Sequence, residues 1–462
     1  MLSSAFWLCR GSCRRHLLSG LSSFSPPPPL AALWSSAVSR AAGKRPAVVL
    51  DGQMKLDTAE FRAIFTPEVR QLADLFRQNG YELRIAGGAV RDLLMRKLPE
   101  DIDFATTATP AEMKAMFERE GVRMLNTKGE THGTVTARIN DRQNFEVTTL
   151  RVDRETDGRH AEVEFTRDWR IDAERRDLTI NSMFLGLDGT LVDFFHGKED
   201  LEQCRVAFVG DATARIREDY LRILRYFRFY GRTAIEANAH CPQTLQAIRE
   251  NGDGLAGISG ERIWTELRKI SVGNHAASMM ECMHDLQLTQ YMGLPLDADI
   301  ANFRRIWQRA KSLEPRPVTL LASLLRTEAD VQQFEARLRI SADERKTAQF
   351  LVNHRGDKEE GLKAYKDLVF LLQAKEKNVL AYTQEVLKYR GEEELLARLN
   401  HWPVPKLPVT GKDLLAAGVP KGKGIGTILD RLKEEWMAED YTPSREDLLA
   451  RLPQFLKDAD DG

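Results

Sequence analysis

The sequence predicts a small α/β domain, a mixed sheet with flanking helices, followed by an all-helical region. Short strand-like runs alternate with helix-period segments from residue 81 to about 195. After Gly197 the strand signal disappears, and helical periodicity dominates from 199 to 462. With 462 residues, 42% hydrophobic and 29% charged, the chain has the composition of a globular protein and is long enough for several domains.

The first fifty residues differ from the rest. They hold six Lys or Arg, many Ser and no Asp or Glu, which is typical of a mitochondrial transit peptide. Arg10, Arg14 and Arg15 interrupt the apolar core that a secretory signal needs, so a disordered basic tail is the remaining alternative. We therefore expect the protein to be located in the mitochondrial matrix. A second start at Met54, which begins "MKLDTAEF", would give a cytoplasmic or nuclear form.

The elements follow in order along the chain. Residues 55 to 80 are expected to be helical. The expected strands are "LRIAGG", "DIDFAT", "TVTARI", "FEVTTLRV", "AEVEFT", "MFLGL" and "TLVDFF". The predicted division is a transit peptide at 1–50, an α/β head at 55–197, a helical neck at 198–272, a helical body at 273–400 and a helical tail at 401–462.

The stretch "GGAVRDLLMRKLPEDIDFAT" (87–106) combines two features. A strand running into Gly87 and Gly88 and then a helix lets backbone N–H groups approach a phosphate. In "DIDF" the strand period of 2 predicts the carboxylates of Asp101 and Asp103 on one face, with Ile102 and Phe104 packed behind. Such a pair suits Mg²⁺. The glycine turn and the aspartate pair are each common in α/β domains, but the two together are what nucleotidyl transfer requires.

Four further stretches carry a family resemblance. "ERRDLTINSMF" (174–184), "DFFHGKEDL" (193–201), "EDYLRILRYFRFYGR" (218–232) and "ISGERIWTELRKI" (258–270) follow the first stretch in this order. Together the five resemble the motifs of class II CCA-adding enzymes, in the polymerase β nucleotidyltransferase superfamily, from about residue 55 to the C-terminus. The resemblance implies a nucleotidyltransferase head with a helical neck, body and tail, the last two binding tRNA.

The stretch "EDYLRILRYFRFYGR" (218–232) predicts a helix that recognises a base. Asp219, Arg222, Arg225 and Arg228 recur at three-residue spacing, while Leu221, Leu224 and Phe227 supply an apolar face. An Asp accepts a hydrogen bond from an exocyclic amino group, and an Arg donates one to a ring acceptor. One Asp-Arg pair can therefore recognise both cytosine and adenine. The alternative is an ordinary surface salt bridge between Asp219 and Arg222.

The resemblance implies roles for particular residues. Asp101 and Asp103 are catalytic and bind the metal. Independently of the resemblance, strand alternation in "NFEVTTLR" makes Glu146 a candidate third metal-facing carboxylate, with a solvent-facing glutamate as an equal alternative. The residues implied to bind the nucleotide are Gly88, Arg91, Arg176, Asp219, Arg222, Arg225 and Arg228. Those implied to support them are Gly87, Asp92, Arg175, Asp177, Asn181 and Glu218.

The activity implied is the stepwise addition of C, C and A to the 3′ end of tRNA. The expected partners are CTP, ATP and a tRNA lacking all or part of CCA, with Mg²⁺ as cofactor and no nucleic-acid template. We expect a monomer or homodimer. The alternatives are a poly(A) polymerase of the same superfamily and a noncatalytic RNA-binding protein.

Charge, hydropathy and cysteine content limit the remaining choices. Without the six basic residues of the first fifty the formal charge changes from −1 to −7, so tRNA binding needs a local basic face. Residues 205–232, with seven arginines against three acids, are one candidate. No window approaches the roughly 18 apolar residues of a membrane helix. The five cysteines have no zinc spacing, and Cys204, Cys241 and Cys282 are expected to be reduced thiols that are buried or half-buried.

Overall fold

The chain divides into two units, residues 1–48 and Val49–Gly462. This computed structural model describes residues 49–50, 53–125, 132–156, 161–356, 361–422 and 424–455, all in the second unit. The predicted transit peptide, except for Val49 and Leu50, therefore lies outside the described residues, as do Cys9 and Cys13.

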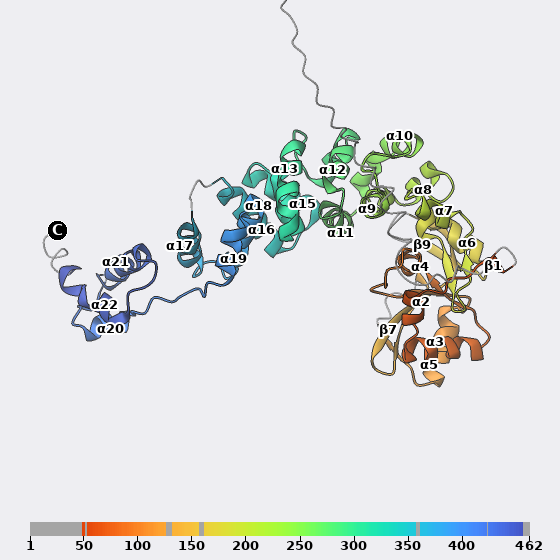
Figure 1. The fold of residues 1–462 in the computed structure, drawn as a ribbon, viewed down its shortest axis with the longest axis horizontal. Helices are drawn as coiled ribbons and strands as arrows, with labels where there is room; N and C mark the ends of the chain where they lie inside the picture. The colour runs from red at the N-terminus through yellow and green to blue at the C-terminus, as the bar shows by residue number, and fades with distance from the viewer. Residues whose placement is uncertain are drawn as a thin grey trace, which may run out of the picture. The chain divides into compact units, whose positions relative to one another are not determined.

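A seven-stranded mixed sheet forms the centre of the α/β part, as predicted (Figure 1). The strand order is β11-β10-β3-β4-β7-β6-β5; β4 and β7 are parallel, and the other neighbours are antiparallel. The bounds are β3 (Leu83–Ala86), β4 (Phe104–Thr106), β5 (Arg123–Leu125), β6 (Thr134–Ile139), β7 (Gln143–Thr149), β10 (Phe184–Gly186) and β11 (Leu191–Val192).

Two further pairs of strands lie outside this sheet. They are β1 (Val49–Leu50) with β2 (Gln53–Met54), and β8 (Arg151–Thr156) with β9 (Ala161–Phe165). The run "FEVTTLRV", expected as one strand, is divided between β7 and β8. The reason is that Leu150 leaves the β6 ladder: its N–H donates to Thr106 and its carbonyl accepts from Thr166. Three short strands, β1, β2 and β5, were not predicted, and β1 lies at the end of the segment assigned to the transit peptide.

The two faces of the seven-stranded sheet differ in character. One face carries buried Ile85, Phe104, Phe145 and Val147, which belong to the main hydrophobic core. The helices α3 (Pro67–Gln78) and α5 (Pro110–Arg119) pack on this face (Figure 1). Because side chains alternate along a strand, the polar residues between these apolar ones point to the opposite face. A functional site can therefore form on the face that α3 and α5 leave uncovered.

Local sequence explains where the helices of the head begin. Thr66 and Thr109 each cap a helix whose first residue is Pro, and Glu112 completes a capping box with Thr109. The other helices of this part are α2 (Ala59–Ala63), α4 (Gly88–Leu94) and α6 (Trp169–Glu174). On the second face of the sheet, Trp169 of α6 packs with Phe184 at a ring-centroid distance of 4.8 Å.

From residue 197 onward the described chain contains helices and no strand, as predicted. The helices are α7 (Gly197–Glu202), α8 (Ala212–Glu218), α9 (Arg222–Thr233), α10 (Pro242–Glu250), α11 (Gly260–Ser271), α12 (Ala276–Asp285), α13 (Ile300–Ala310), α14 (Pro317–Leu321), α15 (Glu328–Leu338), α16 (Ala342–His354), α17 (Leu362–Leu372), α18 (Val379–Arg390), α19 (Glu393–Asn400), α20 (Gly411–Ala416), α21 (Gly424–Ala438) and α22 (Arg445–Ala450).

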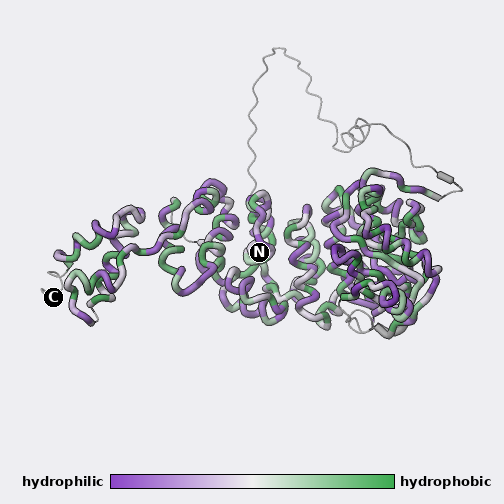
Figure 2. Tube along the Cα trace, turned by 90° about the horizontal axis from the view of Figure 1, so that it is seen from below, coloured by the Kyte–Doolittle hydropathy of each residue, from purple (hydrophilic) through white to green (hydrophobic). Residues whose placement is uncertain are grey.

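These helices are amphipathic, and hydrophobic and hydrophilic residues alternate along them (Figure 2). In α11, for example, Ile263, Leu267 and Ile270 are buried at helical spacing. A second hydrophobic cluster gathers residues between Val409 and Phe455 together with Phe370. Within the described ranges no helix has the length and apolar character needed to cross a membrane. Cys204, Cys241 and Cys282 are free thiols, as predicted, and Cys204 and Cys282 are half-buried. Cys241 is exposed, contrary to the prediction, because it lies in the loop just before α10.

Candidate active site

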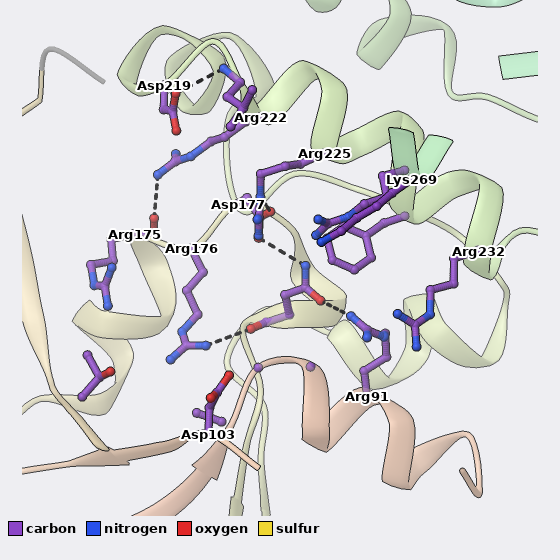
Figure 3. A pocket seen from close by; sticks show the side chains of 18 of the residues that line it. Arg91, Asp103, Arg175, Arg176, Asp177, Asp219, Arg222, Arg225, Arg232 and Lys269 are labelled. Carbon is purple, nitrogen blue, oxygen red and sulfur yellow. Dashed lines mark hydrogen bonds and ion pairs between the residues drawn. The ribbon is translucent and has the colours of Figure 1, made fainter. Parts of the chain in front are cut away.

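A cavity of about 1170 Å³ collects most of the predicted site residues on the face of the sheet that α3 and α5 do not cover (Figure 3). Its walls come from the β3–α4 turn, the start of β4, strands β6 and β7, and helices α8, α9 and α11. The predicted residues that line it are Gly87, Gly88, Arg91, Asp103, Glu146, Arg175, Arg176, Asp177, Asn181, Glu218, Asp219, Arg222, Arg225 and Arg228. Asp92 and Asp101 do not line it.

The glycine turn has the predicted form. Strand β3 ends at Ala86, Gly87 has φ +65°, and α4 begins at Gly88 with Val90 and Leu93 buried. The backbone conformation of Gly87 favours glycine, and a Cβ there would lie 3.3 Å from Nη1 of Arg176, so a larger residue would also displace the guanidinium slightly.

The carboxylate pair differs from the prediction in one respect. Strand β4 begins only at Phe104, with Ile85 as its partner, so Asp103 faces Ala86, whose N–H donates to the Asp103 carbonyl (2.9 Å). Asp101 has no partner strand, because β3 has already turned into α4 at that point. It lies in an exposed bend outside the cavity wall, so the prediction that both aspartates share a strand is wrong.

Asp103 nevertheless lies in an acidic environment. The parallel pairing of Phe104 with Val147 brings Glu146 of β7 next to Asp103. Burial, followed by the charges of Glu146 and Asp101, raises the pKa of the Asp103 carboxyl, and Arg176 opposes this shift. Among the described residues no three or more His, Cys, Asp or Glu side chains form a preassembled metal site.

A buried hydrogen-bonded chain connects α4 to α9 (Figure 3). Arg91 donates to the Asn181 side-chain oxygen (2.7 Å), Asn181 donates to Asp177 (3.3 Å), and Arg225 Nε donates to the other oxygen of Asp177 (2.6 Å). Burial alone would raise the pKa of Asp177, but Arg225 and these hydrogen bonds hold it below its ordinary value. The supporting residues Asp177 and Asn181 thus fix two of the predicted nucleotide-binding arginines.

Asp172 of α6 was not predicted, yet it positions two predicted arginines. One oxygen accepts from Arg175 (3.0 and 2.8 Å) and from the backbone N–H of Arg151 (3.1 Å); the other accepts from Arg176 (3.3 and 3.1 Å). Burial would raise the pKa of Asp172, but Arg176 and Arg175 keep it below its ordinary value. Its spacing of three and four residues before the two arginines was a signal in the sequence.

Asp172→Asn is expected to lower the free energy of unfolding by about 3 kcal/mol, because it leaves two half-buried guanidinium groups without their counter-charge. Thermal and denaturant unfolding measure this. The control is Asp74→Asn, which breaks an exposed pair with Arg77 and should cost less than about 1 kcal/mol.

The pH dependence of this difference has a definite sign. Because the folded-state pKa of Asp172 is lowered, its contribution is complete above the ordinary value of 3.8 and is lost as the pH falls through the folded pKa. The difference in the free energy of unfolding between wild type and Asp172→Asn should therefore be constant around neutral pH and disappear at acidic pH. An equal loss for Asp172→Asn and Asp74→Asn would contradict the role of Asp172.

The predicted base-recognising pair is arranged differently from expectation. Helix α8 ends at Glu218, and Asp219 is extended (φ −155°); its carboxylate accepts from the Leu221 N–H (3.2 Å) and its carbonyl from the Arg222 N–H (2.9 Å). These bonds turn the chain, so α9 begins at Arg222, and the prediction that Asp219 shares its helix is wrong. The apolar face is as predicted, with Leu221, Leu224 and Phe227 buried.

Asp219 and Arg222 both line the cavity, but their side chains do not pair with each other (Figure 3). Asp219 accepts from Arg262 of α11 (2.7 Å). Arg222 donates to Glu218 (2.6 Å) and to the carbonyls of Arg215 (3.0 Å) and Arg175 (2.9 Å). The alternative of a simple surface salt bridge between Asp219 and Arg222 is thereby excluded, since each is held separately toward the same space.

Phe229 of α9 is a further cavity residue that the sequence reasoning missed. Its ring lies under three guanidinium groups, at 4.9 Å from Arg91, 5.7 Å from Arg225 and 4.3 Å from Arg228. Arg228 is also paired with the buried Glu266 (2.9 Å). Asp92, although outside the cavity wall, pairs with Arg91 (3.1 Å) and with Arg232 (3.3 Å), so it supports the same cluster.

The charge of the cavity wall suits a polyanion. The lining residues include ten Lys or Arg against six Asp or Glu. Four of the seven arginines between 205 and 232, namely Arg222, Arg225, Arg228 and Arg232, are among them. The basic segment that the sequence suggested for tRNA thus contributes much of its charge to this cavity.

The carboxylates, the glycine turn and the arginine-rich wall are arranged as the predicted nucleotidyltransferase site requires, and comparison with known proteins supports this class. A family model described as the poly A polymerase head domain matches residues 83–207. A second one, described as a probable RNA- and SrmB-binding site of polymerase A, matches residues 241–296.

Comparison with whole proteins is more specific. The mitochondrial CCA tRNA nucleotidyltransferase 1 of Danio rerio is 56% identical over 407 residues, covering 87% of this chain and 94% of the relative; that of Homo sapiens is 51% identical over 403 residues, covering 86% and 92%. The crystal structure of the Bacillus stearothermophilus CCA-adding enzyme in complex with CTP superimposes with a TM-score of 0.70 at 26% identity, over 88% of this chain and 100% of that one. The chain belongs to the family of CCA tRNA nucleotidyltransferases.

Proposed function

We propose that this enzyme adds C, C and A, one nucleotide at a time, to the 3′ end of a tRNA that lacks all or part of this sequence. In each step the terminal 3′-oxygen bonds to the α-phosphorus of CTP or ATP, its proton passes to solvent, and diphosphate leaves. The observation that carries the proposal is that Asp219 and Arg222 face the same cavity as Asp103.

Base selection is assigned to Asp219 and Arg222. Asp219 can accept from N4 of cytosine or N6 of adenine, and Arg222 can donate to the neighbouring ring nitrogen. Uracil and guanine present a carbonyl where the carboxylate needs a donor, which costs roughly 1–3 kcal/mol for each unpaired buried group. Arg262 and Glu218, which hold the two residues at 2.7 and 2.6 Å, keep them oriented without a nucleic-acid template.

The triphosphate is assigned to the arginines near the glycine turn. Arg176 lies beside Gly87, and Arg91 lies beside Gly88, where a Cβ would be 3.6 Å from its Nη2. Arg225 and Arg228, stacked on Phe229, add positive charge from the opposite wall. Since these cations are fixed in advance by Asp172, Asp177 and Glu266, little reorganisation is needed when the anion enters.

The carboxylates fit a divalent metal ion, for which we propose Mg²⁺. Asp103 and Glu146 lie side by side, and Asp101 is near enough to raise the pKa of Asp103. Mg²⁺ is usually held by one or two carboxylates together with substrate phosphates, so the lack of a preassembled group of three ligands among the described residues agrees with this choice. When bound, the ion would lower the pKa of the attacking hydroxyl and offset the triphosphate charge.

Primer extension at single-nucleotide resolution tests the function. Purified protein and a tRNA transcript ending before CCA are incubated with CTP, ATP, both, UTP or GTP. We expect two additions with CTP alone, three with CTP and ATP, and then a stop. A long ATP-dependent ladder would indicate a poly(A) polymerase instead, and binding of RNA without extension would indicate a noncatalytic protein.

Several further properties are proposed alongside the activity. The composition of the first fifty residues and the mitochondrial relatives support a mitochondrial location. The additional form starting at Met54 has no support in these relatives and stays a prediction. The division into head (55–197), neck (198–272), body (273–400) and tail (401–462), tRNA binding by the last two, and a monomeric or homodimeric state are also retained as proposals.

A further inference from the structure

We infer that the hydroxyl groups of Thr134 and Thr148 bind the terminal ribose of the acceptor strand, the nucleotide that carries the attacking 3′-hydroxyl. The inference rests on the proposed function and adds a binding subsite to it. Both threonines line the cavity that contains Asp103 and Glu146.

The sheet fixes the two hydroxyl groups beside the carboxylates. Thr148 lies two residues after Glu146 on β7 and therefore points to the same face. Thr134 of β6 is its direct cross-strand partner, and the two Oγ1 atoms are 2.9 Å apart. The pair thus forms a small polar wall next to Glu146.

The strand order places this wall on one side of Asp103. In the order β3-β4-β7-β6, the glycine turn and Arg91 follow β3, on one side of Asp103, whereas Glu146, Thr148 and Thr134 lie on the other side. The attacking and leaving oxygens of phosphoryl transfer are roughly in line. If diphosphate leaves toward Arg91, the 3′-hydroxyl has to enter from the side of Thr148 and Thr134.

The hydrogen-bonding capacity of the pair suits a ribose. Two hydroxyl groups carry two protons, and the bond between them uses one. The other proton can be donated to a sugar oxygen, and the free lone pairs can accept from a 2′-hydroxyl. A terminal ribonucleotide offers both kinds of group, whereas a 2′-deoxynucleotide offers no 2′ partner.

The test compares two tRNA primers ending in CC, one with a terminal ribose and one with a terminal 2′-deoxyribose, in the addition of A. For the full-length wild type we expect kcat/KM to be roughly 3- to 10-fold higher with the ribose primer, the effect of one neutral hydrogen bond. Thr148→Val should abolish this preference by lowering kcat/KM for the ribose primer alone, without changing KM for ATP. Thr134→Val should weaken the preference.

Two controls separate this role from a general structural effect. Thr148→Ser retains the hydroxyl and should restore the preference. Thr265→Val, at an exposed position of α11 outside the cavity, should behave as wild type. A Thr148→Val enzyme that still prefers the ribose primer by the wild-type factor would overturn this inference but not the proposed function. A wild type that extends neither primer would overturn the proposed function as well.

Discussion

Asp103→Asn is expected to lower the rate of nucleotide addition by roughly 10³-fold or more while the protein remains folded. Asn preserves the shape of the side chain, and the Asp103 backbone carbonyl still accepts from Ala86. The substitution removes the negative charge next to Glu146, where the metal ion is proposed to bind. The charge is not needed for stability, because burial and the charges of Glu146 and Asp101 raise the pKa of Asp103 and so destabilise its ionised form.

Single-turnover extension with saturating CTP measures this effect, and circular dichroism checks the fold. Glu120→Gln is the matched control, since Glu120 is an exposed carboxylate paired with Arg119 outside the cavity and should be neutral. Because Asp101 lies outside the cavity wall, Asp101→Asn should be less severe than Asp103→Asn if Glu146 is the second ligand. An Asp103→Asn enzyme with near wild-type activity would contradict the catalytic assignment.

Asp219→Asn is expected to reduce the preference for CTP over UTP by roughly 10²-fold. The amide can present an N–H to the O4 carbonyl of uracil, whereas the carboxylate can only accept. Asn can still accept from the Leu221 N–H, so the turn between α8 and α9 is retained. The ion pair with Arg262 is weakened, which should raise KM for CTP as well.

Competition between CTP and UTP in primer extension measures this ratio directly. Asp253→Asn provides the control, because Asp253 is exposed in the same helical region and does not line the cavity. Unchanged discrimination by Asp219→Asn would mean that another group reads the base, even if the overall rate falls.

The sequence predicted the fold well wherever a pattern was long enough. Seven expected runs correspond to strands, and the glycine turn, the change to helices after Gly197 and the buried face of α9 were all correct. The break at Asp219 was missed because a helical period continues through it. Only the bonds from Asp219 to Leu221 and Arg222 show that the chain turns there.

The site was predicted less completely, because its charges are held by long-range partners. Glu266 is 38 residues from Arg228, and Arg262 is 43 residues from Asp219, so no local spacing relates them. Phe229 is an aromatic residue in a helix with an extensive apolar face, and nothing distinguished it from a core residue until three arginines were found around its ring. Asp101 was misplaced since alternation alone does not show where a partner strand ends.

An experimental structure of the protein with CTP and Mg²⁺, and a second one with ATP, would test the central proposal most directly. We expect both bases in the same cavity, with the exocyclic amino group against Asp219, the ring nitrogen against Arg222 and the α-phosphate beside Asp103. A base bound away from Asp219 and Arg222 in either structure would contradict recognition of both nucleotides by this one pair.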